Sequence, residues 1–393
     1  MNTEQAPQWL SPYLIPFFTL SYPTAVPANP DSFPDSSYYT TGLLDGCLLI
    51  TLIAIMAVLR DVLRLWVLEP FAKWKLTRDL RLRASAKQKK ANGNGHNGVS
   101  NGNGKANGAS NGEGKSTAVA NENGRARRVV SNSNGHSVGA QGVIISRREA
   151  KKMHRSVIRF AEQGWPVVYY TFVWSFGLYV HSNLPTRILD PIDVWLNYPH
   201  IPIAGPVKLY YSLNTAFYMH QILIINAEAH RQDHWQMMTH HVITIFLMIG
   251  SYFYNYTRIG CLIMLIMDWC DIFLPLAKMF RYLSFTRLCD ATFVFFMLSW
   301  VTTRHVLFLL AIKSTWSALD LFPSIWAPER SITTEVHVTF LSMLITLQFI
   351  QIWWFWRICL VAWRVVSGQG AEDNRSDDED DDGSSGNDLE KDE

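Results

Sequence analysis

The chain has 393 residues, of which 48% are hydrophobic and 13% are aromatic, and its formal net charge is +2. Its mean hydropathy lies near zero because long apolar blocks are averaged with a polar linker and a charged end. From Ala371 onward 12 residues are acidic and 2 are basic, so the rest of the chain is strongly positive. This composition excludes an ordinary soluble chain, and no nucleic-acid partner is expected.

Seven apolar segments are long enough to cross a bilayer, which takes about 20 residues per helix. Because only helices and closed barrels span membranes, helices are expected throughout. The sequence therefore predicts an all-α, polytopic membrane protein with about seven transmembrane helices. The segments are 43–67, 165–182, 206–227, 235–254, 258–278, 290–311 and 337–362.

Composition divides the chain into four parts. Residues 1–90 hold the first transmembrane helix and a basic loop, and residues 91–145 form an Asn/Gly/Ser-rich linker that is expected to be disordered. Residues 146–366 hold the other six segments in one bundle, which is predicted to enclose a lipid-binding tunnel. Residues 367–393 are an acidic, disordered tail.

The distribution of positive charge predicts the orientation in the membrane. Ten Lys and Arg residues lie between Arg60 and Lys90, directly after the first apolar segment. Loops rich in Lys and Arg stay in the cytosol, so the N-terminus is predicted to be lumenal. Alternation across seven helices then places the C-terminus in the cytosol.

Two adjacent histidines and two aspartates lie inside apolar segments, where an ionisable group costs at least about 2.5 kcal/mol. His240 shares a helix face with Thr244, and His241 is turned from it by about 100°. Asp268 and Asp271 share a face of the next segment, which follows a tight turn. The sequence predicts that these segments pack as antiparallel neighbours and bring the carboxylates to the imidazoles.

A carboxylate beside an imidazole fixes its tautomer and stabilises its charged form. Such a histidine can act as a general base or as a nucleophile that forms an acyl-imidazole with a thioester. The alternative is that the histidines and aspartates only form hydrogen bonds between helices. Cys270 lies between the aspartates but has no nucleophile elbow, so a role as nucleophile is not favoured.

A metal site is a second alternative for the histidines. His230 and His234, followed by the histidine pair, resemble one histidine box of membrane di-iron hydroxylases. Position 237 is Met where such a box needs His, and the other histidines form no second box. The five cysteines are scattered without a CxxC pair, so neither a zinc site nor a disulfide framework is predicted.

A group of cations lies at the predicted cytosolic face and could bind the phosphates of a nucleotide-bearing acyl donor. These residues could equally serve only the positive-inside rule. They are Arg231, Lys278, Arg281 and Arg287.

Several motifs resemble one family. The sequence HHVIT, then SYFYNYTRIG and then MDWCDIFLPLAKMFRY, is similar to the Lag motif of ceramide synthases. The upstream segments FAEQGWPVVYYTFVWSFGLYV and KLYYSLNTAFYMHQ are also similar to that family. The resemblance covers roughly residues 146–366, a TLC-type membrane domain, and is nearest to fungal members. Many animal relatives have His where this chain has Met267, and their homeobox-like segment is replaced here by the linker.

The resemblance implies a sphingoid base N-acyltransferase of the endoplasmic reticulum that uses fatty acyl-CoA as co-substrate and needs no cofactor or metal. It implies that His240, His241, Asp268 and Asp271 are catalytic. Candidate partners are the bilayer, a small single-span regulatory subunit and a second copy of the chain. Candidate substrate-binding residues are Arg231, Thr244, Asn255, Arg258, Lys278 and Arg281.

Two mechanisms remain open at this stage. In one, His240 attacks the thioester and an aspartate orients the imidazole; in the other, His240 is a general base in direct transfer. The alternative function is a non-catalytic TLC-type protein that binds or helps to translocate lipid or cargo, and a metal-dependent lipid hydroxylase is a third hypothesis.

Overall fold

The computed structural model of the chain describes residues 11–93, 137–138, 144–145, 147–196, 198–227, 233–321 and 333–367. It divides into two compact units, one made of Met1–Arg64 and Glu162–Glu393 and the other of Leu65–Ala161. The predicted linker and the predicted acidic tail lie almost wholly outside the described residues. The four-part division drawn from composition therefore stays a prediction.

Helices account for most of the described chain. In the first unit they are α1 (Ile15–Phe18), α2 (Asp45–Val62), the 3-10 helix η2 (Pro191–Trp195), α5 (Gly205–Ala227), α6 (His234–Phe253), α7 (Thr257–Asp271), α8 (Phe273–Tyr282), α9 (Thr286–Trp300), the π-helix η3 (Val301–Leu307), α10 (Phe308–Leu321) and α11 (Thr334–Val366). Helix α4 (Arg147–Ser182) begins in the second unit and continues into the first.

The second unit is built on helix α3 (Glu69–Gly93), which follows the π-helix η1 (Leu63–Leu68). Phe71 of α3 packs on Phe160 of α4 with ring centroids 6.0 Å apart. Two short strands, β3 (Ser137–Val138) and β4 (Ile144–Ile145), pair antiparallel in this unit. Apart from this pair, the unit is held together by the contact between its two helices.

Four helical stretches are long and apolar enough to cross a membrane, namely Asp45–Ala86, Thr257–Tyr282, Thr286–Ala318 and Thr334–Val366. They match the predicted segments 43–67, 258–278, 290–311 and 337–362. The segments 165–182, 206–227 and 235–254 also lie in helices, α4, α5 and α6, but are not among these four. The all-α, multi-pass membrane fold is confirmed, and the count of seven stays a prediction.

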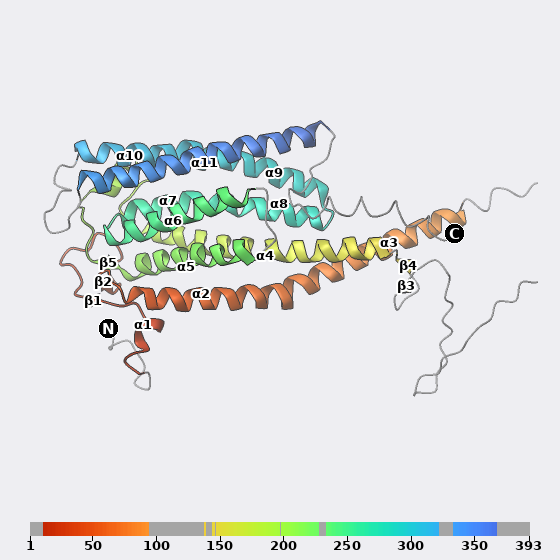
Figure 1. Cartoon of the computed structure of the whole chain (residues 1–393), viewed down its shortest axis with the longest axis horizontal. Helices are drawn as coiled ribbons and strands as arrows, with labels where there is room; N and C mark the ends of the chain where they lie inside the picture. Colours follow the sequence, from red (N-terminus) through yellow and green to blue (C-terminus); the bar gives the residue numbers. More distant parts are fainter. Residues whose placement is uncertain are drawn as a thin grey trace, which may run out of the picture. The chain divides into compact units, whose positions relative to one another are not determined.

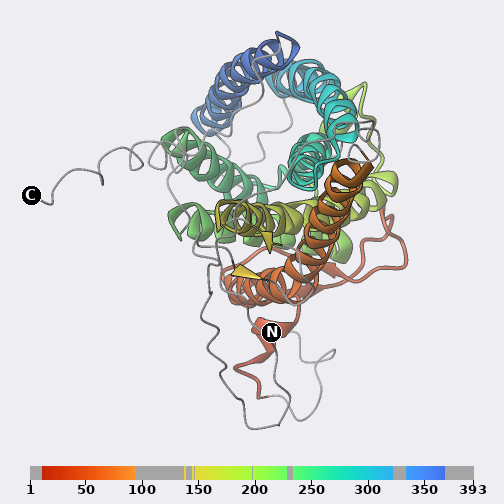
Figure 2. The ribbon, with the colours of Figure 1, turned by 90° about the vertical axis from the view of Figure 1, so that its right-hand side faces the viewer.

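The helices of the first unit run side by side, with α2 along one edge and α10 and α11 along the other (Figure 1). The end-on view in Figure 2 shows α11 between α10 and α6. Helix α7 contacts α5, α6, α9 and α10, and 11 of its 15 residues are buried, against 7 of the 33 residues of α11. The helix that carries both aspartates is therefore the more enclosed of the two.

The turn between α6 and α7 reverses the chain within three residues. Asn255 has φ 59°, the left-handed conformation that asparagine adopts more readily than most residues. The Tyr254 amide donates to the Gly250 carbonyl at 2.9 Å, which ends α6. This turn makes α6 and α7 antiparallel neighbours, as the sequence predicted.

A glycine lets α7 approach α5 closely. A Cβ atom at Gly260 would lie 1.5 Å from the Tyr211 hydroxyl oxygen of α5. That hydroxyl is itself hydrogen-bonded to Ser251 of α6 at 3.1 Å. Small residues at such positions are the usual means by which membrane helices pack against each other.

A small sheet and a buried ion pair attach the N-terminal segment to α5. Strands β1 (Pro23–Thr24), β2 (Tyr38–Tyr39) and β5 (Ile203–Ala204) pair antiparallel in the order β1-β2-β5. Just after β5, Lys208 Nζ donates to the carbonyls of Ser21 at 2.7 Å and Thr40 at 2.8 Å. The same ammonium lies 2.8 Å from Asp45 Oδ1 of α2.

His200, in the loop before β5, gives the protein a pH-dependent stability. Burial, with the positive charge of Arg258, lowers the pKa of His200 to about 4. The unfolded chain binds this proton at higher pH than the folded chain, so stability is lost as pH falls from about 6.5 to about 4. We expect the apparent melting temperature to drop over this range, and to drop less in His200→Gln.

The matched control for this measurement is His154→Gln, which changes an exposed histidine of α4. This control should show the same pH dependence as the wild type. If His200→Gln did so too, the burial of His200 would not be coupled to folding.

Candidate active site

The two histidines of α6 lie in different surroundings. Their rings are 5.4 Å apart and nearly perpendicular, at 85°. His241 Nδ1 lies 2.8 Å from the Met237 carbonyl oxygen, which can only accept, so Nδ1 carries the proton and Nε2 the lone pair. His240 Nδ1 is buried without a hydrogen-bond partner. The two histidines are therefore not equivalent, as the helical period predicted.

An aromatic side chain from α11 and one from α5 border the histidine pair. The Trp354 ring lies 5.2 Å from the His240 ring, at 71°. The Tyr218 ring lies 5.6 Å from that of His241 and 6.5 Å from that of His240. Tyr218 is buried and so forms part of the wall around both histidines.

Asp268 is fully buried, and neither of its carboxylate oxygens has a hydrogen-bond partner. Thr244 Oγ1, one helical turn from His240, is also buried without a partner. Buried polar atoms are nearly always hydrogen-bonded, so unpaired atoms on neighbouring helices require an explanation. We interpret the unpaired Asp268 carboxylate as a site that binds a polar group of a ligand.

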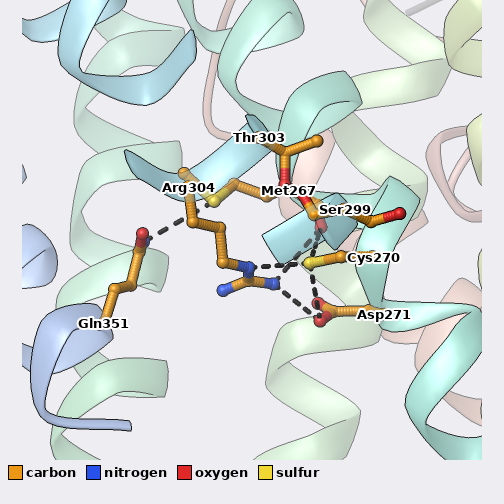
Figure 3. Close-up of polar contacts among 7 residues, drawn as sticks. All are labelled: Met267, Cys270, Asp271, Ser299, Thr303, Arg304 and Gln351. Atoms are coloured by element: carbon orange, nitrogen blue, oxygen red, sulfur yellow. Dashed lines mark hydrogen bonds and ion pairs between the residues drawn. The ribbon is translucent and has the colours of Figure 1, made fainter. Parts of the chain in front are cut away.

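Asp271 has a different partner. Its Oδ1 accepts a hydrogen bond from Arg304 Nη2 at 2.6 Å, and Arg304 lies in η3 (Figure 3). Arg304 Nε also donates to the Cys270 sulfur at 2.9 Å. The Cys270 thiol is fully buried. Its contacts make it part of the Arg304 environment, and the expectation that it is not the nucleophile stays a prediction.

The histidines and aspartates lie at a similar height in the bundle. His240 is 13 residues before the end of α6, and Asp268 is 11 residues after the start of α7. At 1.5 Å per residue these positions are about 20 and 17 Å from the connecting turn. Among the described residues, Asp268 accepts no hydrogen bond from either imidazole. The prediction of a shared height therefore agrees with the helix geometry, whereas a direct Asp268–imidazole hydrogen bond is absent.

The predicted substrate-binding residues separate into three groups. Thr244 lies beside His240, and Lys278 and Arg281 lie in α8, beyond the aspartates along the same direction. Asn255 and Arg258 lie at the opposite end of α6 and α7, where Asn255 makes the turn and Arg258 pairs with Asp31. Arg231 lies outside the described residues.

Of the four cations predicted to bind phosphates, Lys278 and Arg281 lie in α8 and Arg287 lies in the first turn of α9, so the role of these three stays a prediction. Arg281 is exposed in the last turn of α8. Asn255 and Arg258 have contacts that account for a role in the turn, and the structure does not bring them to the histidines. Among the described residues no group of three or more His, Cys, Asp or Glu side chains is placed to hold a metal ion. His230 is not among those residues.

Sequence reasoning missed Arg304, Tyr218 and the polar residues of α11. Arg304 is 4% exposed at its side chain, and Gln351 donates to the Met267 sulfur at 3.6 Å (Figure 3). A signal for Arg304 exists, because an arginine inside an apolar segment needs a buried partner. No comparable signal marks Tyr218 or Gln351, since tyrosine and glutamine occur in many helix interfaces.

Comparison with known proteins decides the family. A family model described as the TLC domain of the TRAM, LAG1 and CLN8 proteins matches residues 159–360, just over half of the chain. The chain belongs to the TLC-domain family. The matched TLC domain contains both histidines, both aspartates and Arg304.

Individual relatives match over the same part of the chain. A ceramide synthase of Gibberella moniliformis is 36% identical over 256 residues, which cover 58% of this chain and 60% of that protein. A sphingosine N-acyltransferase of Schizosaccharomyces pombe is 37% identical over 231 residues, 58% of this chain and 59% of that protein. A ceramide synthase of Bos taurus is 34% identical over 233 residues, 58% of this chain and 56% of that protein. The chain thus spans about 60% of the length of these relatives, and the TLC domain is the shared part.

Proposed function

We propose that this protein is a ceramide synthase, which transfers a fatty acyl group from acyl-CoA to the amine of a sphingoid base. The observation that carries the proposal is an imidazole with an unpartnered Nδ1, His240, at the height of a fully buried, unpartnered carboxylate, Asp268. Relatives of this TLC domain carry the names ceramide synthase and sphingosine N-acyltransferase. A protein that only bound lipid would gain nothing from burying a carboxylate without a countercharge at the height of two histidines.

The chemistry that we propose proceeds in two stages. A lone pair of the His240 imidazole attacks the thioester carbonyl carbon, so a C–N bond forms and the C–S bond breaks. The imidazole N–H proton passes to the thiolate of CoA, which leaves as the thiol. The amine then attacks the acyl-imidazole, and the acyl group moves from the ring nitrogen to the amine nitrogen. His241, whose lone pair is on Nε2, is our candidate for accepting a proton in the second stage.

The position in the cell and the partners belong to the same proposal. Residence in the endoplasmic reticulum membrane with a cytosolic C-terminus is supported by the family resemblance and by the cationic segment after α2, which was predicted to be a loop and forms helix α3. The bilayer holds the bundle, and a tunnel inside it would receive both chains. Lys278 and Arg281 in α8 are candidates for the phosphates of CoA. A small single-span subunit and a second copy of the chain remain proposed partners, which co-purification can identify.

The test is amide formation by the purified protein in lipid nanodiscs. It receives a sphingoid base together with long-chain or very-long-chain acyl-CoA, and ceramide is measured by mass spectrometry. Ceramide is the expected product, and acyl-CoA alone is expected to add one acyl group to the intact protein mass. Ceramide without any adduct under saturating donor would favour direct transfer with His240 as general base. No ceramide from folded protein, with and without added candidate subunits, would favour the non-catalytic function.

A further inference from the structure

The two buried aspartates of α7 differ in the charge that faces them. Asp271 Oδ1 lies 2.6 Å from Arg304 Nη2, so its negative charge is compensated. Asp268, almost one helical turn earlier, is 0% exposed, and neither of its oxygens has a hydrogen-bond partner among the described residues. Within this part of the chain, Arg304 forms an ion pair with Asp271 and none is formed with Asp268.

Three further contacts prevent Arg304 from serving both. Its Nε donates to the Cys270 sulfur at 2.9 Å, and its Nη2 also donates to the Met267 carbonyl at 3.2 Å (Figure 3). Its guanidinium carbon lies 4.4 Å from the centre of the Trp300 ring, one turn back along the helix. The planar guanidinium can satisfy this set in one orientation only. Moving it toward Asp268 would break contacts to the last turn of α7.

The unequal pairing has an electrostatic consequence. An ionised carboxylate in a low-dielectric interior is strongly unfavourable unless a cation or several hydrogen-bond donors reach it. Because Arg304 is held on Asp271, Asp268 gains most from a cationic ligand group. The acceptor of the proposed reaction brings such a group, since a long-chain amine is protonated in water near neutral pH.

We propose that Arg304 is a positioning residue, which holds Asp271 in an ion pair and so leaves Asp268 to receive the ammonium group of the acceptor lipid. This inference rests on the proposed function and assigns a separate role to each aspartate. Asp271 holds Arg304 in place within the site, and Asp268 contacts the substrate.

Every proton that moves during acyl transfer to the amine has a defined acceptor. The Asp268 carboxylate takes one proton from the ammonium, which leaves a neutral amine with its lone pair. The amine nitrogen attacks the acyl carbon, a C–N bond forms, and the bond from the acyl carbon to the His240 ring nitrogen breaks. A second proton moves from the amine nitrogen through His241 to the leaving imidazole, which restores neutral His240. Asp268 releases its proton to water before the next turnover.

Variants that remove one or both charges of the Asp271–Arg304 ion pair test the roles assigned to these residues. Arg304→Gln leaves Asp271 unpaired, and Asp271→Asn leaves Arg304 unpaired, so each should lower kcat/KM at least about a hundredfold. The double variant Asp271→Asn/Arg304→Gln removes both charges, and should recover activity to within about tenfold of wild type. Arg304→Lys keeps the positive charge, and its kcat/KM should lie between those of the single charge-removing variants and that of the wild type. If the double variant were as inactive as Asp271→Asn, Asp271 itself would act on the substrate and the inference would be wrong.

Asp268→Asn is expected to behave differently. It should raise the KM for the sphingoid base at least about tenfold with little effect on the KM for acyl-CoA. Acylation of the protein by acyl-CoA alone should persist, because the amine plays no part in that stage. An unchanged KM for the base would overturn the role of Asp268, whereas ceramide formation by the wild type would still support the proposed function.

A binding measurement separates the two proposals even without turnover. A long-chain primary amine should raise the apparent melting temperature of the wild type and of the double variant more than the matched long-chain alcohol does. Asp268→Asn should respond equally to both ligands. Equal responses in the wild type would contradict the ammonium site, and a preference for the amine in an inactive wild type would support it while the transferase proposal failed. Variants that fail to fold are identified by their melting curves, and Arg304→Lys then replaces Arg304→Gln.

Discussion

His240→Ala is expected to abolish ceramide formation while leaving the protein folded. Among the described residues the ring has no hydrogen-bond partner at Nδ1, so its removal breaks no hydrogen bond there and leaves a cavity beside Trp354. Removal of a nucleophile that acts together with its neighbours costs at least about a thousandfold in kcat. Acylation of the intact protein by acyl-CoA should disappear as well. Product and adduct are both measured by mass spectrometry.

The control for His240→Ala is His154→Ala, which removes an exposed histidine of α4 and should retain wild-type activity. His241→Ala is the informative comparison, because His241 is the candidate for proton transfer in the second stage. This variant should form the acyl adduct and transfer the acyl group to the sphingoid base slowly. Acylation that persists in His240→Ala but is lost in His241→Ala would exchange the roles that we assign to the two histidines.

Lys208→Met is expected to cause the largest loss of stability of any single substitution considered. The ammonium of Lys208 is 0% exposed and contacts two backbone carbonyls and the Asp45 carboxylate. Without it, Asp45 keeps the Tyr252 hydroxyl at 2.7 Å and the Gly42 amide at 3.0 Å, but loses its countercharge. Breaking one side of a buried ion pair costs about 3–5 kcal/mol. Thermal unfolding in nanodiscs measures the effect.

The matched control is Lys73→Met, which removes the lysine of an exposed pair with Glu69 in α3. The Lys73 side chain is 55% exposed, and the two charges are 3.5 Å apart. Such pairs contribute less than about 1 kcal/mol, so the melting temperature should hardly change. The double variant Lys208→Met/Asp45→Asn should recover part of the lost stability. Equal melting temperatures for Lys208→Met and Lys73→Met would contradict a structural role for the buried pair.

The helical membrane fold could be predicted from the sequence, because apolar segments of spanning length are visible directly. The sequence also singles out His240, His241, Asp268 and Asp271, because burying an ionisable residue in an apolar segment is costly, and their catalytic role stays a prediction. The antiparallel arrangement of α6 and α7 was predictable as well, since two spanning helices joined by a turn of three residues must cross the membrane in opposite directions.

The partner of each charged group could not be predicted in the same way. Arg304 and Asp271 are 33 positions apart, and Lys208 reaches carbonyls of Ser21 and Thr40 in a different part of the chain. Spacing gives the face of one helix but not the rotation of that helix against its neighbours. For the same reason Arg258, which shares a motif with the site residues, was predicted to bind substrate although it lies at the far end of α7 and pairs with Asp31.

The π-helix η3 also affects how this segment can change in length. It gives the backbone one residue more per hydrogen-bonded turn than an α-helix has, and it lies between the regular helices α9 and α10. Seven residues of a π-helix turn the chain about as far as six residues of an α-helix, so deleting one residue from Val301–Leu307 would allow an uninterrupted α-helix without rotating α9 against α10. Trp300 and Phe308, which pack in separate core clusters, could then both keep their neighbours. A deletion within α9 or α10 would instead rotate the side chains on its two sides by about 100° relative to each other, so a single deletion should be tolerated better in this segment than in the regular helices beside it.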